Sequence, residues 1–123
     1  MSSPLVLVVE DELLIARDIA MQLQDLGYTP LGPATTGEQA IEMAQQWQPQ
    51  VVLMDVHLAS AMDGITAAQT IRDRFGINTV FLSAFDVDDR LARAKRAEPL
   101  GFLSKPFMDY QLRDVMAVAL QCR

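Results

Sequence analysis

Two short apolar runs, each ending in acidic residues, decide how this chain folds. Residues 5–12 read LVLVVEDE, and residues 51–55 read VVLMD. Continuous apolar runs rich in valine are typical of strands that are buried on both faces of a parallel sheet. We therefore expect Leu5–Val9 and Val51–Met54 to be the two central strands.

Outward from these runs, strand-like and helix-like segments alternate along the chain. Further β-rich runs occur at Tyr28–Leu31, Thr79–Leu82 and Phe102–Leu103. The segments between and after the five runs carry apolar residues at every third or fourth position, which is typical of amphipathic helices. Five strands and five helices in strict alternation predict an α/β fold of the (βα)5 type. In such a three-layer sandwich, right-handed crossovers join parallel strands and helices cover both faces of the sheet.

Residues at the ends of the expected helices agree with this pattern. Gly27 and Gly76 follow two of the periodic segments, where a left-handed residue commonly ends a helix. Before the second helix, a capping box can be formed by Thr36 with Gln39 or, shifted by one, by Thr35 with Glu38.

Length, charge and cysteine content narrow the class of protein. At 123 residues the chain suffices for one domain, which we expect to span about residues 4–121 without an output domain. A net charge of −6 argues against a nucleic-acid surface. No apolar run approaches the roughly 20 residues that span a bilayer, and no signal-peptide pattern follows Met1. The single cysteine, Cys122, cannot form an internal disulfide, which is typical of a protein in the reducing cytoplasm. Together these observations predict a cytoplasmic protein that contacts neither membrane nor nucleic acid.

Polar residues follow four of the expected strands. They are Glu10 and Asp11 after the first, Asp55 after the third, Ser83 after the fourth and Lys105 after the fifth. The carboxyl ends of parallel strands meet at one edge of the sheet, so these side chains should lie together. Clustered carboxylates repel one another, and a hard divalent cation such as Mg²⁺ or Mn²⁺ relieves that repulsion.

A site of this composition suits phosphoryl transfer. The cation would neutralise the charge that otherwise repels a phosphoryl group, and a carboxylate can act as the nucleophile. Lys105 supplies a second positive charge, and the hydroxyl of Ser83 supplies a hydrogen-bond donor.

These residues carry a resemblance to a known family. The segments are Val8–Glu12, Leu53–Asp55, Met62–Gly64, Leu82–Ala84 and Lys105–Phe107. With them in this order, the chain resembles the response-regulator receiver domain of two-component signalling systems over nearly its whole length. The resemblance implies a flavodoxin-like fold with a parallel sheet of order 2-1-3-4-5.

The resemblance also implies a role for each site residue. Glu10 and Asp11 would hold Mg²⁺ together with Asp55, the phospho-acceptor, and the backbone carbonyl of His57. Lys105 and Ser83 would contact the phosphoryl group. Ser83 and Phe102 would form the switch, and a cis peptide bond would precede Pro106.

Such a domain is a signalling switch and not an enzyme in the ordinary sense. The phosphoryl group would come from a histidine kinase or a phosphotransfer protein. The signal would leave through the surface of the fourth helix, fifth strand and fifth helix, toward a downstream effector domain or protein. A homodimer is also compatible with the resemblance.

Three departures from familiar members concern a loop and one aromatic position. The segment from Asp55 to Asp63 is one residue longer, and Ala59 stands where those members have proline. Phe102 replaces a tyrosine, which removes a hydroxyl and keeps the ring.

Three alternatives to this function stay open. A flavodoxin-type cofactor binder would need a loop rich in glycine, serine or threonine where the acidic residues 10–12 stand. An aspartate-nucleophile phosphatase usually has a second aspartate where His57 is found. A pseudo-receiver would be an interaction module that works without phosphorylation.

Overall fold

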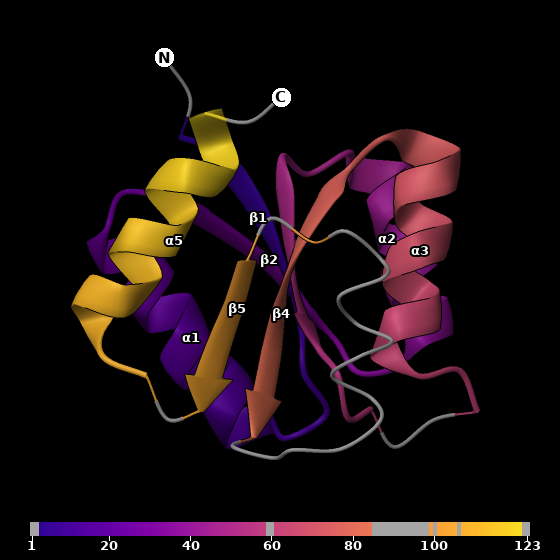
Figure 1. The fold of residues 1–123 in the computed structure, drawn as a ribbon, viewed down its shortest axis with the longest axis horizontal. Helices are drawn as coiled ribbons and strands as arrows, with labels where there is room; N and C mark the ends of the chain where they lie inside the picture. Colours follow the sequence, from indigo (N-terminus) through magenta and orange to yellow (C-terminus); the bar gives the residue numbers. More distant parts are fainter. Residues whose placement is uncertain (1–2, 59–60, 85–98, 100, 106, 122–123) are drawn as a thin grey trace.

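A computed structural model describes residues 3–58, 61–84, 99, 101–105 and 107–121. In this described part of the chain, five parallel strands form one sheet in the order β2-β1-β3-β4-β5 (Figure 1). The strands are β1 (Leu5–Val9), β2 (Thr29–Ala34), β3 (Val51–Asp55), β4 (Asn78–Ala84) and β5 (Gly101–Lys105). The helices are α1 (Leu13–Asp25), α2 (Gly37–Trp47), α3 (Gly64–Phe75) and α5 (Asp109–Gln121). The predicted parallel sheet and its order are confirmed, whereas the expected fourth helix lies outside the described residues.

The sheet is the middle layer of a three-layer sandwich. Helices α1 and α5 cover one face, and α2 and α3 cover the other (Figure 1). Alternate residues of the central strands serve the two cores. Leu7 and Val52 pack with α2 and α3, whereas Val6 and Leu53 pack with α1 and α5. The central strands are apolar at every position because helices cover both of their faces.

The register of the strands brings their carboxyl ends to one edge. Val9 pairs with Met54, Asp55 pairs with Leu82, and Ala84 pairs with Lys105. The residues that follow β1 and β3 and those that end β4 and β5 therefore line the same rim of the sheet.

Strand β2 extends beyond the expected Tyr28–Leu31, through residues TPLGPA. The run contains two prolines, which are tolerated on an edge strand, and β2 is at the edge of the sheet. The pairing with β1 is irregular between Leu7 and Val9. At this irregularity Gly32 has φ +108°, and a Cβ on it would lie 2.9 Å from the carbonyl oxygen of Val8, so glycine is required.

The helix ends follow the sequence pattern with one refinement. The Thr36 hydroxyl accepts a hydrogen bond from the Gln39 backbone N–H at 3.0 Å, which selects the first of the two capping registers. Gly76 ends α3 in the left-handed conformation, with φ +69°. Leu26 ends α1, and Gly27 follows it with φ +93°. Over the described residues, none of the helices combines the length and the apolar character needed to cross a membrane.

Candidate functional site

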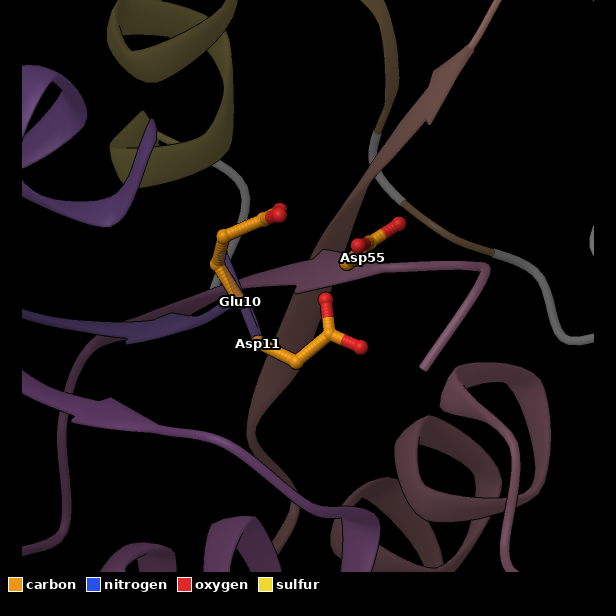
Figure 2. Close-up of side chains that lie close together, drawn as sticks. All are labelled: Glu10, Asp11 and Asp55. Atoms are coloured by element: carbon orange, nitrogen blue, oxygen red, sulfur yellow. The ribbon is translucent and has the colours of Figure 1, made fainter. Parts of the chain in front are cut away.

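Three carboxylates converge where β1 and β3 end. Glu10 and Asp11 follow β1, Asp55 is the last residue of β3, and the three side chains lie close together (Figure 2). One oxygen atom from each lies within 4.8 Å of the others. Glu10 is fully buried and Asp55 is 3% exposed, whereas Asp11 is half-buried.

Lys105 brings a positive charge to this cluster from the end of β5. Its Nζ donates a hydrogen bond to Oε2 of Glu10 at 2.7 Å and lies 3.3 Å from Oδ2 of Asp55. The ammonium is itself largely shielded, since the side chain is 18% exposed. One cation therefore faces two nearly buried carboxylates, and the sequence did not indicate which of them it would hold more closely.

Burial and charge shift the protonation of this group. Burial raises the pKa of Glu10 from 4.5 to about 7; the hydrogen bond from Lys105 works against this rise, and the charge of Asp55 adds to it. Burial alone would lower the pKa of Lys105, but its hydrogen bond to Glu10 and the charge of Asp55 more than reverse this and raise it above its ordinary value. The site thus carries more negative charge than Lys105 balances.

Backbone groups orient the two buried carboxylates. The His57 N–H donates to Oδ1 of Asp55 at 2.9 Å, and the Glu12 N–H donates to Oε1 of Glu10 at 3.4 Å. At the start of α3, Gly64 lies so close to β3 that a Cβ on it would stand 2.0 Å from the Asp55 carbonyl oxygen. Only glycine fits there, which explains the Asp63-Gly64 pair.

The two expected switch residues lie on neighbouring strands. Ser83 is half-buried near the end of β4 and pairs with Ser104, the residue before Lys105. Phe102 on β5 is half-buried and packs on Phe81, with ring centroids 5.9 Å apart. The structure thus places Ser83 on the rim with the acidic cluster and Phe102 farther from it along the sheet. Pro106 and the expected cis bond before it lie outside the described residues.

The donor set fits a hard divalent cation. The three converging side chains offer carboxylate oxygens, which Mg²⁺ and Mn²⁺ prefer to nitrogen or sulfur. The excess negative charge around Glu10 and Asp55 provides the attraction. The expected fourth ligand, the backbone carbonyl of His57, stays a prediction, although His57 does lie in the loop beside Asp55.

Sequence reasoning missed a groove beside the site. It has a volume of about 420 Å³ and is lined by one face of α1 together with Lys105 and Phe107. The face of α1 that lines it includes Ile15, Asp18 and Gln22. Little in the sequence indicated this groove, because the α1 residues that line it are partly apolar and partly polar. Only the fold places them opposite Lys105 and Phe107.

Comparison with known proteins shows which protein family has this arrangement. Residues 6–117 match the family described as the response regulator receiver domain. The chain belongs to this family. It is 40% identical over 102 residues to the transcriptional regulatory protein PdtaR of Mycobacterium tuberculosis, covering 83% of this chain and 49% of that protein. It is 30% identical over 116 residues to the phyllosphere-induced regulator PhyR of Methylorubrum extorquens, covering 94% and 43% respectively.

Solved structures show the same receiver fold. The signal receiver domain of a modulated diguanylate cyclase from Desulfovibrio desulfuricans superimposes with a TM-score of 0.91 at 33% identity, covering 97% of this chain and 94% of that one. The predicted family of two-component signalling is confirmed, and the pseudo-receiver alternative is not favoured. Membership of this family also argues against the flavodoxin-type cofactor binder and the phosphatase. The receiver domain spans about half the length of the curated relatives named above.

Proposed function

We propose that this receiver domain accepts a phosphoryl group on Asp55, in the cytoplasm, with the help of a divalent cation. The observation that carries the proposal is the setting of Asp55 itself. Its carboxylate is nearly buried at the end of a central strand, grouped with Glu10 and Asp11 and 3.3 Å from the ammonium of Lys105. Such a group is oriented, desolvated and flanked by both signs of charge, as a carboxylate nucleophile needs to be.

The chain's own residues divide the work of the transfer. The His57 N–H holds Oδ1 of Asp55, so we assign Oδ2, on the side of Lys105, as the attacking atom. The bond from Oδ2 to phosphorus forms as the donor's nitrogen–phosphorus bond breaks, and the electron pair of that bond returns to the imidazole nitrogen. Lys105 and Ser83 would then stabilise the phosphoryl oxygens.

Asp11, Asp55 and Glu10 would hold Mg²⁺ or Mn²⁺, with the backbone carbonyl of His57 as a further ligand. A cation held there would offset the carboxylate charge and supply positive charge for the transferred phosphoryl group. Without it, the excess negative charge of the cluster opposes the approach of an anionic donor.

The surroundings of the site suit a protein donor. Leu14 on α1 is 81% exposed and Met108 before α5 is 63% exposed. Contact surfaces commonly group exposed apolar side chains into one patch, so we take these two as candidates for contact with the donor. Because the donor's phosphorylated histidine must reach Asp55, a histidine kinase or phosphotransfer protein would dock over these residues. Downstream, the signal would pass through Ser83 and Phe102 to an effector domain or protein, either in this monomer or in a homodimer.

The direct test is phosphorylation by acetyl phosphate followed by intact-protein mass spectrometry. We expect one phosphoryl adduct in the presence of Mg²⁺, none in EDTA and none in Asp55→Asn. Asp73→Asn, which removes an exposed carboxylate on α3, serves as the control and should be modified like the wild type. A full adduct on Asp55→Asn would refute the acceptor assignment. The absence of any adduct on the wild-type protein would favour the pseudo-receiver.

A further inference from the structure

The groove beside α1 is lined largely by residues that the proposed phosphoryl transfer does not use. Its volume of about 420 Å³ is within the usual range for pockets that hold small molecules. Ile15 and Ile19 on α1, together with Phe107 before α5, form an apolar wall. The groove can therefore hold the apolar body of a small ligand.

One residue of the groove carries a polar atom that lacks a partner. Gln22 lines the groove, and within the described part of the chain its side-chain oxygen, Oε1, is buried and accepts no hydrogen bond. A buried acceptor without a donor is costly, and such atoms are rare in folded proteins. Because the terminal torsion of glutamine is broad, the amide can turn this oxygen toward the groove when a donor binds there.

A carboxylate lies next to this amide on the same helix. Asp18 also lines the groove, is exposed, and precedes Gln22 by four residues, so the two side chains are neighbours on one face of α1. An ammonium group has three N–H donors and can bond to both residues at once. The ammonium of Lys105 also lines the groove, but it is already held by Glu10 at 2.7 Å.

We propose that this groove binds a small organic ammonium ion with an apolar body. The ammonium would lie between the Asp18 carboxylate and the Gln22 amide oxygen, and the apolar body would lie on Ile15, Ile19 and Phe107. The net charge of −6 also favours a cation over an anion of the same shape.

Occupation of the groove would affect the proposed function at the step of donor docking. Phe107 directly precedes Met108, one of the two exposed residues over which the protein donor would dock. A ligand bound here would therefore compete with the donor, whereas Asp55 does not line the groove and would stay free. This consequence rests on the proposed function, but the binding of the ammonium ion does not.

Titration with 2-phenylethylammonium, followed by ¹H–¹⁵N NMR, tests the site. We expect the largest amide shifts at residues 15–22 and 107, with saturation at millimolar ligand. The anion 3-phenylpropionate and the neutral 2-phenylethanol carry a similar ring and should bind about fivefold more weakly, because they form no ion pair with Asp18. Equal binding of the alcohol and the ammonium ion would show only an apolar hollow and overturn the proposal, as would an absence of shifts on α1.

Two substitutions in the groove separate ligand recognition from packing. Gln22→Met removes Oε1 and keeps an unbranched side chain, so we expect it to bind 2-phenylethylammonium roughly fivefold more weakly and to be at least as stable as the wild type. Asp18→Asn should weaken binding about threefold. Glu42→Gln removes an exposed carboxylate on α2 and should bind like the wild type, which controls for net charge. Wild-type affinity in Gln22→Met would show that Oε1 is a packing defect and would overturn the proposal.

The failure of this inference can be told apart from that of the proposed function, because the titrations involve no phosphoryl transfer. If the protein binds the ammonium ion but is not phosphorylated, only the proposed function is refuted. If it is phosphorylated on Asp55 but does not bind the ammonium ion, only the ligand site in the groove is refuted.

Discussion

At Glu10 the fold buries a carboxylate completely and sets the Lys105 ammonium 2.7 Å from it. Burial nevertheless outweighs that attraction, and the pKa of Glu10 rises to about 7. The residue therefore destabilises the folded protein when it is ionised and no cation is bound. A carboxylate placed at such a cost is typical of a site where a ligand supplies the missing charge.

The first prediction at this scale concerns stability against pH in EDTA. The folded-state pKa of Glu10, about 7, lies above the ordinary value of 4.5, so the folded protein retains a proton that the unfolded chain releases. Glu10 therefore contributes stability that is full below pH 4.5 and is lost as the pH rises through about 7. We expect the free energy of unfolding to fall by on the order of 1–3 kcal/mol over this interval.

Urea denaturation at a series of pH values measures this effect. Glu10→Gln cannot titrate at this position and should show a flatter profile than the wild type. Asp73→Asn on the exposed face of α3 should follow the wild-type profile. Equal slopes for the wild type and Glu10→Gln would show that Glu10 does not titrate in this range.

Among the elements, the start of α3 controls the end of β3. Asp63 caps the helix by accepting a hydrogen bond from the Thr66 N–H at 2.9 Å. The next residue, Gly64, packs directly on the Asp55 carbonyl. Helix α3 thus begins in contact with Asp55, the proposed phospho-acceptor. A shift of this helix would therefore move the Asp55 side chain.

Gly64→Ala tests this coupling. The added Cβ would lie 2.0 Å from the Asp55 carbonyl oxygen, so either α3 or the end of β3 must move. We expect a loss of about 1–3 kcal/mol in the free energy of unfolding. Displacement of Asp55 by about 1 Å should also slow phosphorylation by acetyl phosphate roughly 100-fold.

Gly76→Ala at the other end of α3 is the matched control. Its added Cβ meets nothing within 4 Å, but its φ of +69° is unfavourable for alanine. It should lose about 1 kcal/mol of stability and keep the wild-type phosphorylation rate. If Gly64→Ala is phosphorylated as fast as Gly76→Ala, the start of α3 does not position Asp55.

Over the whole molecule, the site lies at the rim where both halves of the sandwich meet. Beyond β3, strands β4 and β5 lie side by side, and β5 forms the edge of the sheet (Figure 1). Phe102 on β5 packs against Phe81 on β4. Phosphorylation adds roughly 1.5 to 2 negative charges at one end of this sheet. If Ser83 on β4 moves toward the new charge, the neighbouring strand β5 and its residue Phe102 should also shift.

We expect beryllofluoride, a mimic of the phosphoryl group, to produce this change in solution. In NMR spectra of the free and the beryllofluoride-bound domain, the largest shifts outside the site should fall at residues 84–104. The first two helices, α1 and α2, serve as the internal reference because their contacts with the sheet are mainly with β1 and β2. Largest shifts on α1 and α2 would place the output surface elsewhere.

Taken alone, the sequence determined the alternation of elements, the two central strands and the residues at the strand ends. These follow from local signals: uninterrupted apolar runs, helical periodicity and capping residues act over a few positions. Glu10, Asp55 and Lys105 could be named because each directly follows or ends a strand, and Asp11 because it is next to Glu10. The family resemblance supplied the strand order.

Only the tertiary structure decided which side chains meet. The closer contact of Lys105 with Glu10 depends on the register of four strands and on complete burial of one carboxylate. The extension of β2 through two prolines depends on its place at the edge of the sheet. Both are long-range outcomes, because burial and strand pairing are set by residues far apart in the chain, and local patterns do not specify them.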